Sequence, residues 1–429
     1  MQPMLRIGSN MTKRTIDDLA LFGGPPLFAE PLHVGAPNVG DKQRLMRRIE
    51  EILERNWLTN DGPCVESFER EVARRVGVKH CIATTNGTLA LELAARGLGM
   101  HGEVIVPAFT FVATVHAVRW QGMVPVFCDI RADDFNIDPS RIEALITPRT
   151  TGILAVHLWG RSCDVQALEA MARKHGLRLL FDASHAFGCT YHGRSIGQFG
   201  DAEVFSFHAT KFINAFEGGA IVTNDDELAA RVRLMKNFGF TGTDEVSYLG
   251  INGKMTEVAA AMGLTSLESF DTFVRRNRDN YRAYRTGLAS LEGLRLIPFP
   301  EDEQCNYQYV TVQVDPERAG LDRDQLIRLL RAEKVLARRY FYPGVHRMEP
   351  YRSDPRYRSL RLPVTDLAAS RMICLPTGIH VSPKQIEALC KLLGFIIDNA
   401  ERIKGLMDAG YRYARHMPTF SELTGGLVE

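Results

Sequence analysis

The sequence predicts an α/β fold in which a large domain, built on a mainly parallel sheet with helices on both faces, precedes a smaller α+β domain. Two observations support this prediction. From residue 80 onward, short apolar runs alternate with helical stretches, which is typical of βαβ crossovers. Beyond about residue 290, strand patterns reappear in a separate stretch that also contains helices.

An irregular arm and two helices come before the alternating region. The first 40 residues are rich in glycine and proline, as in GGPPLF and HVGAPNVG, which predicts turns instead of a domain. Helices are expected over 41–56 and 64–77 because apolar residues recur there at helical spacing. The expected buried faces carry Leu45, Ile49, Ile52 and Leu53 in the first helix and Val65, Phe68, Val72 and Val76 in the second.

Most of the expected elements of the large domain alternate between strand and helix, and the last two strands extend the sheet. The expected strands are HCIATT, EVIVP, VPVFCDI, TGILAVHLW, RLLFDAS, EVFSF and GGAIVTN. The helices between them are expected to begin near Thr88, Thr110, Pro139 and Val165. A long helical reach follows Lys254, and the smaller domain contains the strand QYVTVQV and a helix from Asp322. The predicted division is an arm over 1–40, a large domain over 41–270, and a small domain with a peripheral tail over 271–429.

Composition excludes several classes of protein. Of the 429 residues, 45% are hydrophobic and 24% charged, and Lys+Arg 52 against Asp+Glu 51 gives a net charge of +1. This balance argues against a nucleic-acid binder. No apolar run reaches the ~18 residues that a membrane helix needs, and the start lacks the pattern of a signal peptide, so we expect a cytoplasmic protein. The eight cysteines form no CxxC pair and no metal site is predicted.

Two motif matches have the wrong context. GLGMHG at 97–102 fits the dinucleotide fingerprint GxGxxG, but it follows a helix and precedes a strand, the reverse of what that motif requires. GRSIG at 193–197 fits the nucleophile elbow GxSxG, but its neighbours favour a hairpin, with Ser195 as a turn residue. Neither motif is expected to carry function.

Four segments place reactive or polar residues directly after predicted strands. They are Asn86-Gly87-Thr88, the stretch from Pro107 to Phe111, Asp182 with His185, and His208 with Lys211. In an open α/β sheet, the carboxyl ends of the strands meet at one ligand crevice. Each signal alone is weak, because a helix cap, a carboxylate at a strand end or a single lysine is usually structural.

Together the four segments fit pyridoxal phosphate. This cofactor needs a lysine amine for a Schiff base, a carboxylate against its pyridine nitrogen and an anion site for its phosphate. The amino end of a helix after Asn86 supplies the anion site, and an aromatic side chain can fix the plane of the ring. A partly desolvated lysine with a lowered pKa suits a nucleophile that also moves protons.

A series of motifs, in order, resembles the DegT/DnrJ/EryC1/StrS family of sugar aminotransferases over about residues 40 to 400. The motifs are NGTLALELA, PAFTFVATVHA, PVFCDI, DASHAFG, the hairpin GRSIGQFGD, SFHATK with FEGGAIVTND, and GINGKMTEVAAAMGL. The resemblance implies a fold-type I aminotransferase, with a seven-stranded type of sheet, that uses pyridoxal phosphate. It also implies a homodimer with active sites at the subunit interface.

The resemblance assigns a role to each matching position. Lys211 matches the lysine that bonds the cofactor and moves the proton, Asp182 the partner of the pyridine nitrogen, and His185 the residue near the phenolic oxygen. Phe111 occupies the stacking position. The phosphate ligands of the family match Gly87, Thr88 and Ser206, with Asn252 reaching the phosphate from the partner subunit. The segment RRYFYPGVH of this chain, with Arg339, Tyr340 and His346, resembles the family's stretch near the substrate pocket.

The resemblance implies transfer of an amino group from L-glutamate to a keto-sugar nucleotide. HATK followed by FEGGA is similar to enzymes that act on carbon 4 of a 4-keto-6-deoxyhexose nucleotide, with dTDP-4-keto-6-deoxyglucose favoured. Three alternatives stay open. The first is an aminotransferase of the same family that acts at carbon 3, on a cyclitol with glutamine as donor, or on another secondary-metabolite ketone. The second is a dehydratase, which is disfavoured because such relatives carry histidine where this chain has Lys211. The third is a non-enzymatic sensor.

Overall fold

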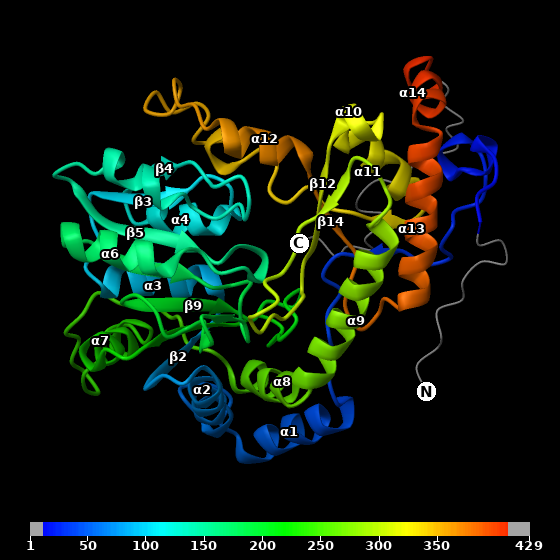
Figure 1. Ribbon diagram of the computed structural model, residues 1–429. Helices are drawn as coiled ribbons and strands as arrows, with labels where there is room; N and C mark the ends of the chain where they lie inside the picture. Colours follow the sequence, from blue (N-terminus) through cyan, green and yellow to red (C-terminus); the bar gives the residue numbers. More distant parts are fainter. Residues whose placement is uncertain (1–11, 411–429) are drawn as a thin grey trace.

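The computed structural model describes residues 12–410. A seven-stranded sheet forms the centre of the larger, N-terminal part (Figure 1). The order of the strands is β2-β10-β9-β6-β5-β3-β4, and every neighbouring pair is parallel except the two pairs that β10 makes. The strands are β2 (His80–Thr84), β3 (Glu103–Pro107), β4 (Val124–Cys128), β5 (Thr150–Val156), β6 (Arg178–Asp182), β9 (Ala202–Ser206) and β10 (Gly219–Thr223). The mainly parallel sheet predicted from the alternating pattern is confirmed.

Helices cover both faces of this sheet, so its strands are buried on both sides. One face packs against α3 (Gly87–Gly97), α4 (Val112–Trp120) and α7 (Asp226–Met235). The other face packs against α1 (Lys42–Arg55), α2 (Pro63–Val76), α6 (Val165–His175) and α8 (Glu257–Glu268), with the short α5 (Pro139–Ile142) nearby. Successive residues of one strand enter opposite cores, as Val104 and Ile105 do, because side chains alternate across a strand.

One expected core residue is in fact exposed. Helix α1 packs through Leu45, Ile49 and Ile52, whereas Leu53 is 58% exposed. Leu45, Ile49 and Ile52 recur at i, i+4 and i+7, which keeps them on one stripe of the helix. Leu53 lies about 100° further around the helix than Ile52, at the edge of this stripe. The prediction for Leu53 was wrong because the helix buries a narrower face than the apolar spacing allows.

The C-terminal part has its own antiparallel sheet and core. The sheet has the order β11-β12-β14, formed by β11 (Leu294–Leu296), β12 (Val310–Val314) and β14 (Met372–Leu375). Around it lie α9 (Phe270–Leu288), α10 (Pro316–Ala319), α11 (Arg323–Ala332), α12 (Pro363–Arg371), α13 (Pro383–Asp398) and α14 (Ala400–Asp408). Helix α9 joins the two parts, since Phe273 packs in the first core and Tyr284 in the second. We propose the division near residue 270 on this ground.

The N-terminal arm is irregular but firmly packed. It contains two 3-10 turns, Ile16–Asp18 and Ala20–Phe22, and the strand β1 (Leu32–His33), which pairs in parallel with β13 (Val335–Leu336). The carboxylate of Glu333 accepts the backbone N–H groups of Ala20 at 2.7 Å and Leu27 at 2.6 Å. The arm therefore completes the C-terminal core. Most of the predicted peripheral tail lies at 411–429, outside the described residues.

The two misleading motifs lie where their context predicted. GRSIG belongs to a hairpin of β7 (Thr190–Tyr191) and β8 (Arg194–Ser195), so Ser195 is a strand residue of the hairpin, not part of its turn. GLGMHG connects the end of α3 to β3. Across residues 12–410, none of the helices combines the length and the apolar character needed to cross a membrane.

Candidate active site

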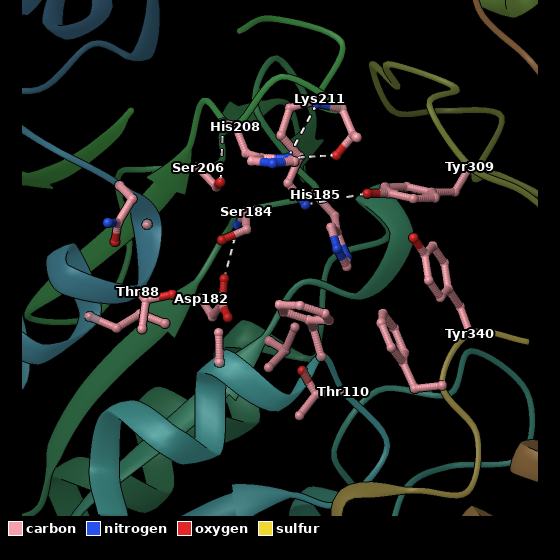
Figure 2. Close-up of a pocket in the computed structure, with 18 of the residues that line it drawn as sticks. Thr88, Thr110, Asp182, Ser184, His185, Ser206, His208, Lys211, Tyr309 and Tyr340 are labelled. Carbon is pink, nitrogen blue, oxygen red and sulfur yellow. Dashed lines mark hydrogen bonds between the residues drawn. The ribbon is translucent and has the colours of Figure 1, made fainter. Parts of the chain in front are cut away.

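A cavity of about 550 Å³ lies beyond the carboxyl ends of the central strands (Figure 2). The last residues of β5, β6 and β9 line it, together with the first turn of α3 and the loop after β9. The predicted site residues that line this cavity are Gly87, Thr88, Phe111, Asp182, His185, Ser206, Lys211 and Tyr340. The structure thus brings together segments that are more than 250 residues apart in the sequence.

Lys211 lies in the long loop between β9 and β10, and its side chain enters the cavity (Figure 2). The loop is fixed by backbone hydrogen bonds from Lys211 N–H to the carbonyl of His208 and from Ala215 N–H to the carbonyl of Phe207, at 2.9 and 2.8 Å. The Nζ atom donates to the hydroxyl of Tyr309 at 3.3 Å. Burial lowers the pKa of Lys211 to about 8, although the nearby carboxylate of Asp182 acts in the opposite direction.

Asp182 is the last residue of β6, and its buried carboxylate is held by two donors. The hydroxyl of Thr114 donates to Oδ2 at 2.7 Å, and the N–H of Ser184 donates to Oδ1 at 3.0 Å. The hydroxyl of Thr114 is itself 2.9 Å from the hydroxyl of Thr110, which lies just before the start of α4. Donors on both oxygens suit the ionised form, which is the form that can hold a protonated ring nitrogen.

His185 is a neutral imidazole with a fixed orientation. Its Nδ1 accepts the backbone N–H of Trp159 at 3.2 Å, which leaves the proton on Nε2. The pKa of His185 lies well below its ordinary value because the ring is buried and, second, because the charge of Lys211 is close. The ring of Phe341 stacks on it with 6.0 Å between centroids and a 5° angle between planes.

The first turn of α3 forms an anion cradle. The side chain of Asn86 accepts the N–H of Leu89 at 2.8 Å, which caps the helix as its sequence predicts. The N–H groups of Gly87 and Thr88 have no acceptor within the helix, and both residues line the cavity. A Cβ on Gly87 would come within 2.9 Å of Cβ of Ser206, so only glycine lets the helix approach the third predicted ligand this closely.

These residues fit pyridoxal phosphate. The cradle offers N–H groups, two hydroxyls and the positive end of a helix to a phosphate. Asp182 offers a carboxylate, and Lys211 offers an amine with a lowered pKa. Phe111 is 43% exposed and lines the cavity, so its ring is available for stacking. Every group that the cofactor requires is present among the residues that line the cavity.

Three predicted site residues lie outside this cavity. Arg339 lines an adjoining cavity of about 350 Å³, which shares Phe111 and Tyr340 with the first. His346 is buried behind the wall, where its Nε2 contacts Asp366 at 3.1 Å, and it lines neither cavity. Asn252 is exposed on the loop before α8 and does not line this cavity. Its expected role requires a second subunit.

Sequence reasoning missed Thr114 and Tyr309. Thr114 carried a usable signal, because Thr110 and Thr114 are four residues apart in an apolar stretch that begins after a strand. Tyr309 carried none, since it belongs to a strand pattern in the other part of the chain. Both residues contact the predicted catalytic groups directly.

A lysine, a carboxylate and an anion cradle at the carboxyl ends of this sheet define a pyridoxal-phosphate-dependent enzyme of the aminotransferase class. The model of the DegT/DnrJ/EryC1/StrS aminotransferase family matches residues 40–393. The chain belongs to this family, and it is a pyridoxal-phosphate-dependent aminotransferase. The resemblance inferred from the motifs is confirmed.

Similar proteins include sugar aminotransferases. The chain is 37% identical over 358 residues to the dTDP-4-amino-4,6-dideoxy-D-glucose transaminase of Shigella dysenteriae, covering 83% of this chain and 97% of that protein. It is 37% identical over 326 residues to the GDP-perosamine synthase of Caulobacter vibrioides, covering 75% and 86%. The structure of DesI in the presence of its TDP-sugar product has 47% sequence identity and a TM-score of 0.88, covering 92% of this chain and 100% of DesI.

Proposed function

We propose that this aminotransferase transfers the amino group of L-glutamate to carbon 4 of dTDP-4-keto-6-deoxyglucose, which gives a 4-amino-4,6-dideoxy sugar nucleotide. The similarity to the dTDP-4-amino-4,6-dideoxy-D-glucose transaminase over 83% of the chain carries this proposal. The similarity to DesI, solved with its TDP-sugar product, supports the same nucleotide. The GDP-perosamine synthase makes a GDP-linked keto-sugar the second candidate.

We assign the cofactor contacts within one chain as the sequence predicts them. Gly87, Thr88 and Ser206 would hold the phosphate, and Phe111 would stack on the ring. When bound, pyridoxal phosphate carries the amino group between the two substrates and withdraws electrons from the carbon that loses a proton. The negative charge of Asp182 stabilises a proton on the pyridine nitrogen. His185 can donate from Nε2, since its Nδ1 already accepts the N–H of Trp159.

Lys211 is the proposed acid and base. Its neutral amine can accept a proton at Nζ and return it from the same atom. The lowered pKa makes both forms accessible near neutral pH, which an ordinary lysine does not allow. Asp182 lies close enough to Lys211 to influence its charge, so the two groups act on one small volume.

The proposed substrate residues flank the adjoining cavity. Arg339 and Tyr340 line it together with Arg331 and Arg338, so several positive groups face this space. Burial lowers the pKa of Arg331, and the charges of Arg339 and Arg338 lower it further. A cluster of this kind suits a diphosphate. We retain His346 as a predicted substrate residue, although the structure places it behind the wall.

We propose that the protein is a homodimer in which the two chains share each active site. We also propose that it is located in the cytoplasm. The segment that precedes Asn252 exposes an unusual set of apolar side chains: Phe238, Phe240, Val246, Tyr248, Leu249 and Ile251. A second copy covering them would allow the role that the resemblance implies for Asn252, which is to contact the phosphate site of the other chain. All eight cysteines are free and buried, which suits a reducing compartment.

The substrate assignment is tested with a panel of keto-sugar nucleotides. Purified protein is incubated with L-glutamate or L-glutamine and with dTDP- or GDP-linked 4-keto and 3-keto sugars. NMR then locates the new amine. We expect turnover with dTDP-4-keto-6-deoxyglucose and an amine on carbon 4. Turnover confined to a 3-keto sugar or to a GDP-linked sugar would contradict the proposal.

The assignment of Lys211 is tested separately. Borohydride should trap the cofactor on a peptide that contains Lys211, as shown by mass spectrometry. The Lys211→Ala variant should lose both the trapped adduct and turnover. An adduct that persists in this variant would contradict the assignment.

A further inference from the structure

A short segment from the C-terminal part contributes one residue to the wall of the active-site cavity and contacts both of its reactive loops. This segment, Cys305–Tyr309, leads directly into β12. The side-chain amide of Asn306 donates to the carbonyl of His185 at 2.9 Å. The side-chain amide of Gln308 donates to the carbonyl of Thr210 at 3.2 Å, beside the catalytic lysine. One segment therefore fixes the positions of the His185 loop and the Lys211 loop relative to each other.

Tyr309 is the residue of this segment that reaches the cavity (Figure 2). Its hydroxyl accepts a hydrogen bond from Nζ of Lys211 at 3.3 Å. Its ring is buried and packs on His185 with 4.6 Å between centroids and an angle of 59°. The ring also lies 6.3 Å from that of Tyr340. These contacts on two sides leave the hydroxyl little freedom to move.

The hydroxyl of Tyr309 stays protonated in the range where the enzyme works. Burial raises the pKa of Tyr309 well above its ordinary value. A neutral phenol still has lone pairs that accept from an ammonium or an amine. Tyr309 can therefore orient Nζ of Lys211 in both protonation states without exchanging a proton itself.

We propose that Tyr309 is a positioning residue that holds the amine of Lys211 in place while it is not bonded to the cofactor. A lysine side chain has four rotatable bonds, so a released amine without a partner would occupy many positions. The hydrogen bond restricts it to the volume next to Asp182 and His185, where it must collect and return the proton. The positioning group comes from the C-terminal part of the chain, so the packing of the two parts determines where the lysine lies.

The test compares Tyr309→Phe with Tyr307→Phe. Tyr307 is two residues away but packs against Tyr281 and Phe299, at 5.3 and 4.9 Å between ring centroids, and does not line the cavity. Both variants keep the aromatic ring and lose one hydroxyl, so both are expected to fold. Full-length enzyme is treated with excess amino donor, which releases Lys211, and the lysine is then labelled with acetic anhydride over a range of pH and measured by mass spectrometry.

Because the hydroxyl accepts from the ammonium, its loss disfavours the charged form of Lys211. We expect the labelling midpoint of Tyr309→Phe to fall by about one pH unit, since a hydrogen bond to a charged group contributes roughly this much. We also expect kcat to fall about tenfold or more, with KM for both substrates nearly unchanged. Tyr307→Phe should match the wild type in all three measurements.

The labelling midpoint separates positioning from packing, because a change in packing alone would not remove the acceptor of the ammonium. The proposal is overturned if Tyr309→Phe labels Lys211 as the wild type does, or if Tyr307→Phe has an equal effect.

The inference rests on the proposed role of Lys211 and not on the identity of the sugar. The labelling uses the amino donor alone, so it gives the same answer whichever ketone is the substrate. A wild-type adduct that maps to another lysine would contradict the proposed function instead, because the trapping experiment does not involve Tyr309.

Discussion

At the scale of single residues, the chemistry of the site depends on the charge state of Lys211, which lies in a buried cavity near the carboxylate of Asp182. Burial disfavours the ammonium form of Lys211, whereas the carboxylate of Asp182 favours it, and burial has the larger effect. If Asp182 dominated, the lysine would stay charged and could not accept a proton. The donors from Thr114 and Ser184 satisfy part of the carboxylate's charge, which leaves less of it to stabilise the ammonium.

The pH dependence follows from the lowered pKa of Lys211. We expect the reaction of the amine-loaded enzyme with its ketone substrate to accelerate as pH rises through about 8, because only the neutral amine accepts the proton. Below this pH, each further unit should slow the reaction about tenfold. Stopped-flow single turnovers at a series of pH values measure the midpoint of this rise in rate. A midpoint near the ordinary lysine pKa of 10.5 would show that burial does not lower the pKa of Lys211.

The cradle gives a second residue-scale prediction. In Gly87→Ala the new methyl group meets Ser206 at 2.9 Å, so the helix and the strand must separate. We expect the affinity for pyridoxal phosphate to fall about tenfold, since overpacking of this kind typically costs 1–3 kcal/mol. Fluorescence titration of cofactor-free enzyme measures it. Gly405→Ala in α14 is the control, because a methyl group there meets no atom within 4 Å. Equal affinities in both variants would argue against the cradle.

At the scale of secondary-structure elements, local pattern explains what the sequence predicts and what it does not. The helix after NGT begins at Gly87 because its cap is local in sequence. The partnership of Lys211 and Tyr309 spans 98 residues. Nothing in NYQYV distinguishes Tyr309, which reaches the cavity, from Tyr307, which packs against Phe299. Likewise, His346 follows the cavity-lining Tyr340 in sequence but is turned away behind the wall.

Helix α12 illustrates an element whose start depends on a distant residue. Its first turn is capped by Asp129 from the end of β4, which accepts the N–H groups of Val364 at 3.2 Å and Thr365 at 2.8 Å and the hydroxyl of Thr365 at 2.8 Å. Asp129 is buried, so its loss leaves these donors without an acceptor. This contact attaches a C-terminal helix to the large sheet.

We therefore expect Asp129→Ala to lower the free energy of unfolding by about 2 kcal/mol, which combines a lost cap with unsatisfied donors. Asp129→Asn retains one acceptor oxygen and should lose less than half as much. Urea denaturation followed by circular dichroism measures both variants. If alanine and asparagine were equally destabilising, the hydrogen bonds to α12 would not be the cause.

At the scale of the whole molecule, the cavity exists because the C-terminal part reaches back over the large sheet. The backbone N–H of Val345 donates to the carbonyl of Ala108 at 2.8 Å, and the hydroxyl of Tyr357 donates to the carbonyl of Pro125 at 2.7 Å. The segment between Arg338 and Met348 thereby forms the wall shared by the two cavities. The arginines on this wall are balanced elsewhere in the chain, which has a net charge of +1. For this reason, composition argued against a nucleic-acid binder but could not predict a local anion site.

The proposed dimer gives a prediction that depends on which chain supplies Asn252. Asn252→Asp places a carboxylate against a phosphate and should inactivate the site that it enters, and Lys211→Ala inactivates the site of its own chain. If Asn252 acts in the partner's site, a hybrid of the two variants contains one site with both wild-type residues and one with neither.

Coexpression of the two chains with different tags yields hybrids, which can be purified by tandem affinity and assayed beside each parent. We expect the parent dimers to be inactive and the purified hybrid to recover about half of the wild-type activity per dimer, because one of its two symmetric sites is intact. If Asn252 acted within its own chain, neither site of the hybrid would be intact and no activity would return. A variant with Leu249→Glu, at the most exposed apolar side chain of the loop, is expected to dissociate the dimer and abolish the recovery.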